Sequence, residues 1–199
     1  MTARARLLVV VVIVLCGALG VISSTQTWLT VALSGGAAAD LTVSGAAAVP
    51  VLAPLSLAVL ALGIALSIAG VVLRYIFGAL AAVIAVAQGW LAAQVVFTHP
   101  VSAVARTVTD ATGITGEQPV SALVASITAS PWPAITLVVW ILLAVAGVFV
   151  LVTARRWPVS GRKYRTDAAK AHDAGPLDAV DSWDELSRGE DPTGGADPR

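Results

Sequence analysis

The sequence predicts an all-α membrane protein, a four-transmembrane-helix bundle with a small extracellular β-hairpin and a disordered cytoplasmic tail. Hydrophobic residues make up 57% of the chain and charged residues only 12%, whereas a soluble domain carries about 25% charged residues. The apolar residues also form long runs that contain no Asp, Glu, Lys or Arg. A helix of roughly 20 such residues crosses a hydrocarbon core of about 30 Å.

The apolar runs place the spans at about residues 7–27, 51–72, 76–97 and 134–153. Lipid cannot pair exposed backbone groups, so each run is expected to be helical. The first run follows Arg4 and Arg6 and therefore also has features of a signal peptide. Because its apolar part is long and no small-residue cleavage site follows, an uncleaved signal anchor is favoured. We expect a membrane domain over residues 1–153 and a tail over residues 154–199.

Basic residues near the spans predict the orientation, because cytoplasmic loops of membrane proteins are enriched in Lys and Arg. One side holds Arg4, Arg6, Arg74, Arg155, Arg156, Arg162, Lys163 and Arg165. The other side holds only Arg106. Both termini are therefore expected in the cytoplasm, and the loops over residues 28–50 and 98–133 outside. Trp28 and Trp132 would lie in the interfacial aromatic belt.

Small side chains recur every four residues in the second and third spans, where they allow helix backbones to approach closely. The rows are Ala61, Ala65 and Ala69 in the second span, and Ala81, Ala85, Gly89 and Ala93 in the third. A short link joins these two spans, so we expect the rows to face each other. Chance in an alanine-rich sequence explains the rows about equally well. Such rows are also compatible with assembly into a homo-oligomer.

The outer loops show their own periodicities. Strand patterns over Trp28–Leu33 and Leu41–Ser44 predict a hairpin. An isolated hairpin is marginal in water, so it is expected to pack on the second outer loop. That loop carries an amphipathic helix pattern from Val101 to Ala111, with Gly113 as its end signal, and a further short helix over Pro119–Thr128. A structural cap over the bundle is favoured over a binding surface.

The predicted spans contain few polar side chains that could take part in catalysis or transport. Ion pathways, proton relays and catalytic centres there need ionisable residues, and the spans have none. Gln88 is the candidate intramembrane polar residue, with Trp90 and Trp140 as aromatic neighbours, although a packing hydrogen bond explains such a glutamine better. Cys16 is the only cysteine. We expect no enzyme, no catalytic residue, no metal and no cofactor.

The tail begins with a basic stretch suited to anionic lipid head groups and is then acidic and poor in apolar residues, as in disordered segments. One apolar pattern interrupts it at Leu177, Val180, Trp183 and Leu186. It predicts a short amphipathic docking segment for a cytosolic protein or the membrane surface. A solvated turn is the alternative.

Several motifs are familiar as a set: Trp28, residues 41–45 (LTVSG), Pro50, Trp132-Pro133, residues 155–158 (RRWP), Tyr164 and residues 183–193 (WDELSRGEDPT). In these residues the chain resembles the tryptophan-associated transmembrane protein family, membrane proteins encoded in tryptophan biosynthesis regions of bacteria. The resemblance implies a bacterial plasma membrane protein and a link to that pathway. It implies no activity and no catalytic residues.

Three functions are consistent with these observations. The first, which we favour, is an accessory or scaffold protein that recruits a cytosolic partner through its tail. The second is a small oligomeric transporter or exporter of an aromatic amino acid, although no charge or broken helix marks a substrate site. The third is an envelope protein that binds through its outer loops. The lipid bilayer is a partner in each case, and nucleic acid in none.

Overall fold

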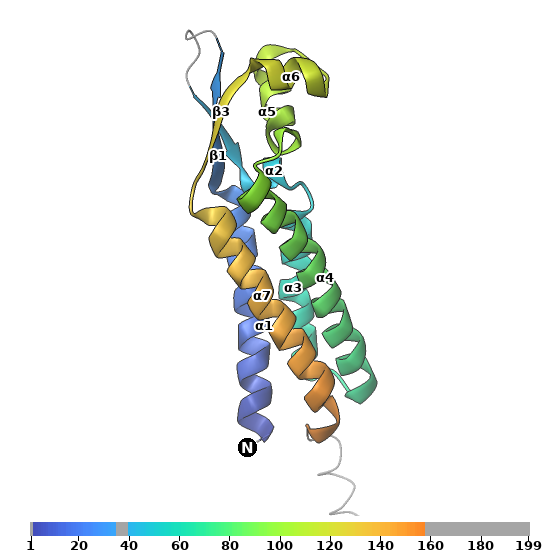
Figure 1. Ribbon diagram of the computed structural model, residues 1–199. Helices are drawn as coiled ribbons and strands as arrows, with labels where there is room; N and C mark the ends of the chain where they lie inside the picture. Colours follow the sequence, from blue (N-terminus) through green and yellow to red (C-terminus); the bar gives the residue numbers. More distant parts are fainter. Residues whose placement is uncertain (1, 35–39, 158–199) are drawn as a thin grey trace, which may run out of the picture. The chain divides into compact units, whose positions relative to one another are not determined.

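A computed structural model describes residues 2–34 and 40–157. Within these residues the chain is mostly helical, with a small sheet at one end (Figure 1). The elements are, in chain order, α1 (Thr2–Thr25), β1 (Thr27–Leu33), β2 (Leu41–Ser44), α2 (Gly45–Ala48), α3 (Leu52–Ile68), α4 (Val71–Thr98), α5 (Val101–Thr112), α6 (Glu117–Leu123), β3 (Val124–Ala129), α7 (Trp132–Thr153) and the 3₁₀ turn η1 (Ala154–Arg156).

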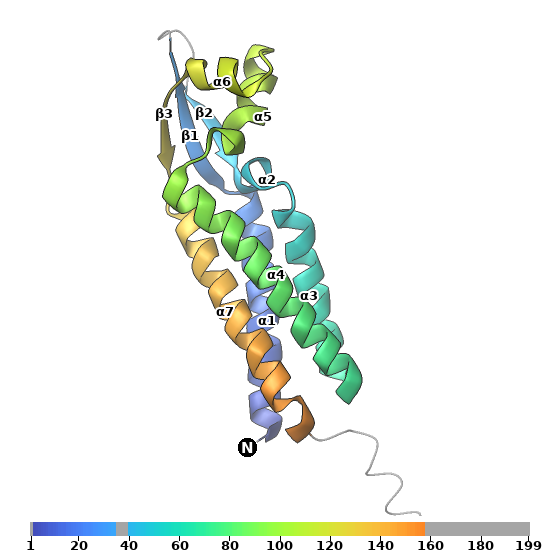
Figure 2. The ribbon, with the colours of Figure 1, turned by 45° about the vertical axis from the view of Figure 1, so that its right-hand side comes forward.

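Four long apolar helices, α1, α3, α4 and α7, run side by side in alternating directions and are called the stem below (Figures 1 and 2). The strands with α2, α5 and α6 form the head at one end. The opposite end, where α1 begins and α7 ends, is called the tail end. Within the stem, α4 packs most extensively on α7, and α1 packs most extensively on α3.

The lengths of the stem helices differ. Three helices, Arg4–Thr25, Val71–Thr98 and Trp132–Thr153, are long and apolar enough to cross a membrane. Helix α3 has 17 residues, or about 26 Å at 1.5 Å per residue. It ends at Ile68 rather than near Val72, because Ala69 adopts an extended conformation with φ −65° and ψ 139°. Val71 and Val72 therefore open α4, which begins earlier than the predicted third span.

The predicted hairpin is present, but it belongs to a larger sheet. β1 pairs antiparallel with β2, with Leu29 opposite Val43. β1 also pairs antiparallel with β3, with Leu29 opposite Ala129, so the strand order is β2-β1-β3. The hairpin thus packs on the second loop, as expected, through backbone pairing. The helix predicted over Pro119–Thr128 is wrong beyond Leu123, because the β-branched stretch that follows forms β3.

Helix α5 confirms the predicted amphipathic helix, and one side of it is buried at Ala103, Val104 and Val108. Gly113 ends it in the left-handed region, with φ 73°, and its N–H donates to the carbonyl of Thr109. Glycine adopts this conformation without a steric penalty.

The stem helices approach one another at glycines. A methyl group on Gly17 of α1 would lie 2.7 Å from the backbone nitrogen of Leu60 in α3. One on Gly147 of α7 would lie 3.0 Å from the backbone nitrogen of Ala82 in α4. Close approach at such small residues is the usual basis of helix packing in lipid.

The predicted small-residue rows have different surroundings. In α4, Ala81 and Ala85 are buried, and the nearest side chain to Gly89 is Trp140 of α7. In α3, Ala61 is exposed. Helix α4 packs more extensively on α7 than on α3. The rotation of α4 about its own axis turns its small residues toward α7. Ala65 and Ala93 are half-buried and Ala69 is buried.

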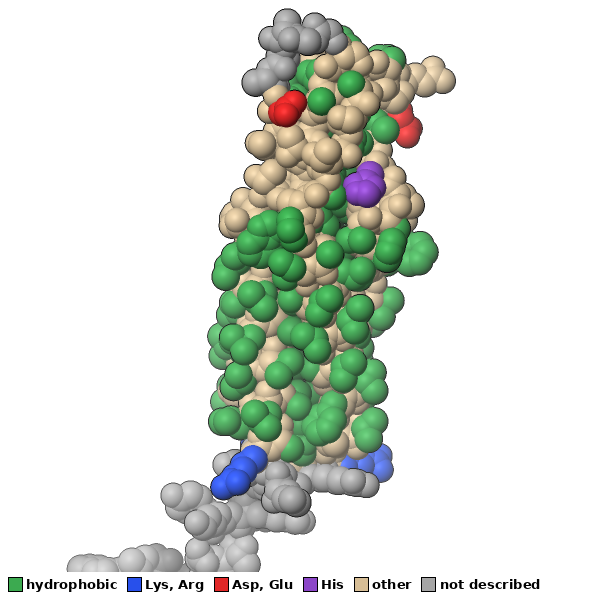
Figure 3. Space-filling model, turned by 60° about the vertical axis from the view of Figure 1, so that its left-hand side comes forward, with side chains coloured by type: hydrophobic (Ala, Val, Ile, Leu, Met, Phe, Trp, Pro, Cys, Tyr) green, Lys and Arg blue, Asp and Glu red, His purple; other side chains and the backbone are tan. Residues whose placement is uncertain are grey.

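The surface of the stem is apolar. Large hydrophobic side chains such as Val83, Val86 and Trp90 are 65–67% exposed. In Figure 3 hydrophobic side chains cover the stem, the visible Lys and Arg lie at its tail end, and the visible Asp and Glu lie on the head. Such a band of exposed apolar surface is suited to contact with a bilayer.

Candidate functional site

Buried polar side chains are not spread evenly through the stem. Arg74 lies near the tail end, whereas the others lie in the half of the stem next to the head: Ser23, Ser24, Ser56, Gln88 and Thr136. Burial of polar groups away from water is costly unless they are hydrogen-bonded. Whether each of these side chains stabilises the stem therefore depends on its hydrogen-bond partners.

The junction between α1 and β1 is held by a compact hydrogen-bond network. Trp28 is fully buried, and its Nε1 donates to the carbonyl oxygen of Ser23 at 3.1 Å and to Ser23 Oγ at 3.0 Å. Ser23 Oγ also shares a hydrogen bond with Thr136 Oγ1 of α7. A methyl group on Gly45 would lie 2.7 Å from Trp28 Nε1. The network thus joins α1, α7 and the head.

The burial of Trp28 corrects its assignment to the interfacial aromatic belt. A belt tryptophan presents its N–H to the wet interface, whereas the N–H of Trp28 is paired within the protein. The pattern of apolar runs predicts only that this residue follows the first span. It cannot show that Gly45 opens a slot for the indole, because that contact depends on how β2 pairs with β1.

Gln88 is buried, at 1% exposure, as expected for the candidate intramembrane polar residue. Its Nε2 donates to the carbonyl oxygen of Val51 at 3.2 Å, just before α3. This is an interhelical packing contact. Oε1 of Gln88 has no hydrogen-bond partner within the described part of the chain.

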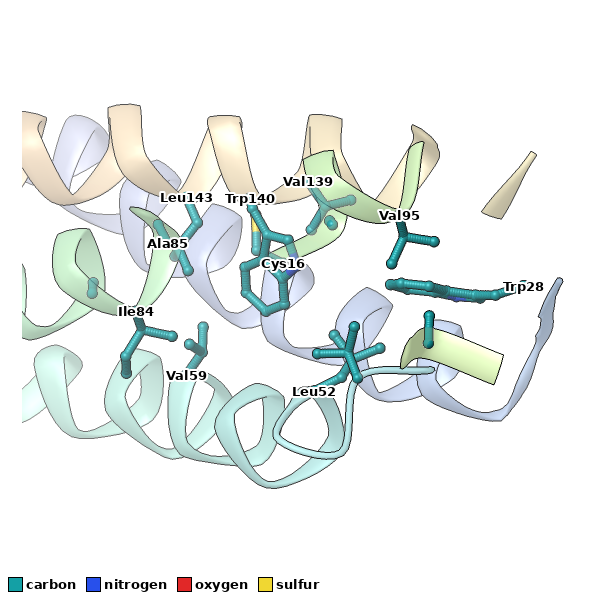
Figure 4. Packing of buried hydrophobic residues seen from close by; sticks show 14 of the residues in the cluster. Cys16, Trp28, Leu52, Val59, Ile84, Ala85, Val95, Val139, Trp140 and Leu143 are labelled. Carbon is teal, nitrogen blue, oxygen red and sulfur yellow. The ribbon is translucent and has the colours of Figure 1, made fainter. Parts of the chain in front are cut away.

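The two aromatic neighbours expected for Gln88 differ. Trp90 is 67% exposed on the outer surface of α4, whereas Trp140 is fully buried. In Figure 4 the Trp140 ring extends from α7 toward Val59 and Leu52 of α3. Nε1 of Trp140, like Oε1 of Gln88, has no partner among the described residues.

A small pocket opens where α4 meets the head, with a volume of about 110 Å³. It is lined by Ala48, Val49, Leu91, Gln94, Val95, Pro100, Ser102 and Ala103. Pockets that enclose drug-sized ligands measure roughly 300–1,000 Å³. This pocket therefore suits a few water molecules better than an aromatic amino acid.

At the tail end Arg74 forms a second polar site, which we call the Arg74 clasp. The side chain is 2% exposed. Its Nε donates to the carbonyl oxygen of Ala69 at 3.0 Å and its Nη1 to that of Trp157 at 3.2 Å. The guanidinium also lies over the Trp157 ring, 5.5 Å from its centre, in the geometry of a cation–π contact.

The Arg74 clasp was not foreseen, because an arginine in a short link between spans first indicates orientation. Nearby, Arg6 of α1 donates to the carbonyl oxygen of Ser67 in α3. The start of α1 is thus bonded to the end of α3, and the segment that follows α7 is bonded to the first turn of α4.

The other predicted features lie in different places. The docking segment with Leu177, Val180, Trp183 and Leu186 lies outside the described residues. Cys16 is a free, buried thiol in the stem. Among residues 2–34 and 40–157, no group of His, Cys, Asp and Glu gathers in a way that could hold a metal ion.

A family model described as tryptophan-associated transmembrane protein matches residues 10–193. The match covers nearly the whole chain and confirms the resemblance seen in the motifs. Neither a curated protein nor a solved structure matches the chain.

Proposed function

The chain belongs to the tryptophan-associated transmembrane protein family, and from this premise we propose that it is a non-catalytic accessory protein of the bacterial plasma membrane. In this proposal it serves tryptophan biosynthesis as a membrane scaffold, whose tail recruits a cytosolic partner. The stem crosses the membrane four times, the head lies outside, and both termini lie in the cytoplasm.

Two observations support four spans in this orientation. Helix α3, with 17 residues, meets the lower limit of about 17 residues for a transmembrane helix. It also packs along α1, a candidate span, for much of its length. At the tail end, Arg4 and Arg155 are exposed and Arg6 is half-exposed, whereas Arg106 in α5 is the one Lys or Arg among the described residues of the head. This asymmetry follows the positive-inside rule.

The Arg74 clasp is the observation that carries the scaffold role. A buried guanidinium is retained only where its hydrogen bonds are satisfied, and here one of them is made to the backbone of Trp157, 83 residues later. The clasp gives the tail a fixed starting point next to the α3–α4 link. A tail anchored at a defined point on the stem raises the effective concentration of its bound partner next to the membrane.

The docking segment supplies the binding element of this proposal. Leu177, Val180, Trp183 and Leu186 recur every three residues in an acidic tail, a pattern typical of a helix that binds in an apolar groove. A tryptophan in such a segment is a frequent binding hot spot. The partner is expected to be a cytosolic protein, with a tryptophan-pathway enzyme as the first candidate.

Proximity labelling from the C-terminus of the full-length protein tests the proposal. A partner enriched by the parent chain should be lost after deletion of residues 177–193 and after the double substitution Trp183→Ala and Leu186→Ala. The matched control Ser187→Ala changes the same segment outside the apolar pattern and should keep the partner. Retention of the same partner after the deletion would refute the scaffold role.

The buried polar groups next to the head favour a second candidate, a small oligomeric transporter of an aromatic amino acid. Against it, the pocket of about 110 Å³ is small for such a substrate. Tryptophan flux into proteoliposomes that is the same with and without the protein would exclude this role.

A third candidate is an envelope protein that binds through its head. Replacement of the head loops by inert linkers, with no effect on the cell, would exclude this role.

A further inference from the structure

Two buried polar atoms from different helices lack partners among the described residues: Oε1 of Gln88 in α4 and Nε1 of Trp140 in α7. One is an acceptor and the other a donor. An unpaired buried group costs about 1–3 kcal/mol, and lipid offers no partner outside the stem. We propose that an internal water molecule is bound between them, donating to Gln88 Oε1 and accepting from Trp140 Nε1–H.

The two side chains converge on the same part of α3. Gln88 Nε2 donates to the carbonyl oxygen of Val51. The far edge of the Trp140 ring and Ser56 Oγ are both close neighbours of Gly20, so the ring reaches the level of Ser56. From Val51 to Ser56 the helix rises only about 7.5 Å. Trp140 also approaches Gly89, the neighbour of Gln88, at 3.7 Å from its Cβ to a methyl group built there, so the two side chains lie in the same part of the stem.

The chemistry of the two groups restricts the ligand. The carbonyl of Val51 can only accept, so the hydrogen bond from Nε2 fixes the orientation of the Gln88 amide and leaves Oε1 as the free atom. The indole N–H of Trp140 can only donate. A ligand between them must offer both a donor and an acceptor, and water is the smallest molecule that does. Buried waters typically make about three such hydrogen bonds.

The pocket beside the head lies close to the proposed water site. Leu91, which lines it, follows Gln88 by three residues, a rise of about 4.5 Å along α4. Val95, which also lines it, follows Gln88 by seven residues and so lies on the same face of the helix. Its volume of about 110 Å³ has room for several waters at about 30 Å³ each. The proposed site lies about one helical turn below this pocket.

Magnetisation transfer from water to the indole N–H groups of the full-length, ¹⁵N-labelled protein in nanodiscs tests the inference. The signal that disappears in Trp140→Phe identifies Trp140 Nε1–H. In the parent chain this signal should show direct transfer from water. Gln88→Met keeps the length of the side chain but removes the acceptor, and should reduce the transfer at least several-fold. Gln118→Met, an exposed glutamine in α6 that lies away from the pocket, should leave it unchanged.

Two results would overturn the inference, and both are measured on the parent chain once Trp140→Phe has assigned the signal. One is the absence of water transfer to Trp140 Nε1–H in the parent chain. The other is a through-bond coupling between that N–H and the side-chain carbonyl of Gln88, which would show that the two groups bond directly without water.

Discussion

Gly147→Ala in α7 is expected to destabilise the stem, because its new methyl group would meet backbone atoms. It would lie 3.0 Å from the nitrogen of Ala82 and 3.1 Å from the carbonyl oxygen of Gly78. Ordinary contacts of this kind begin at 3.4 Å. Backbone atoms of a helix cannot rotate away, so α4 and α7 must separate by a few tenths of an ångström.

The magnitude follows from two opposing effects. Overpacking a tight contact costs about 1–3 kcal/mol, while Ala favours a helix over Gly by up to about 1 kcal/mol. We expect a net loss of about 1–2 kcal/mol in the free energy of unfolding, or about a tenfold change in the unfolding equilibrium. Gly17→Ala should cost more, because its methyl group would lie only 2.7 Å from the nitrogen of Leu60.

Equilibrium unfolding in mixed micelles, followed by far-ultraviolet circular dichroism, measures these differences. The matched control is Gly89→Ala in α4, whose methyl group would lie at an ordinary 3.7 Å from Cβ of Trp140. It should be neutral or stabilising by up to about 1 kcal/mol. If Gly147→Ala is as stable as the parent or more stable than Gly89→Ala, the packing of α4 on α7 at Gly147 is wrong.

Three further predictions concern the hydrogen-bond networks and a turn. Ser23→Ala removes the Oγ that serves Trp28 and Thr136 and should lower the free energy of unfolding by about 1–2 kcal/mol; a parent-like denaturation curve would contradict the network. Arg74→Met should speed trypsin cleavage next to Trp157, which is 3% exposed in the intact clasp, whereas an unchanged rate would show that the clasp does not hold this segment. Gly113→Ala forces a side chain into the left-handed region at φ 73° and should lower the free energy of unfolding by about 1–2 kcal/mol. An unchanged thermal unfolding curve would mean that α5 ends differently.

Hydropathy predicts α1, α4 and α7 well, because a bilayer requires long apolar helices whatever they pack against. It is less certain for α3, where the run over residues 51–72 continues through the turn at Ala69 and Gly70. Apolar composition alone cannot locate that turn, since Val71 and Val72 suit either helix. The local end signal at Gly113, by contrast, acts through one residue and is visible in the sequence.

Features that depend on long-range pairing could not be predicted. β3 pairs with β1 across about a hundred residues, and its sequence is also compatible with an extension of α6. Which small residues meet between helices depends on the rotation of each helix. The alanine rows therefore did not predict the contacts at Gly17 and Gly147. The Arg74 clasp depends on where α7 ends relative to α4.

The sidedness of the two termini tests the proposed four-span scaffold most directly. In a Cys16→Ala background, single cysteines at Thr2→Cys, Ser121→Cys and Ser187→Cys are exposed to a membrane-impermeant maleimide in intact and permeabilised cells. Four spans predict labelling of Ser121→Cys in intact cells, and of Thr2→Cys and Ser187→Cys only after permeabilisation. Labelling of Thr2→Cys and Ser187→Cys from opposite sides would mean an odd number of spans. Labelling of Ser187→Cys in intact cells would place the tail outside and contradict a cytosolic partner.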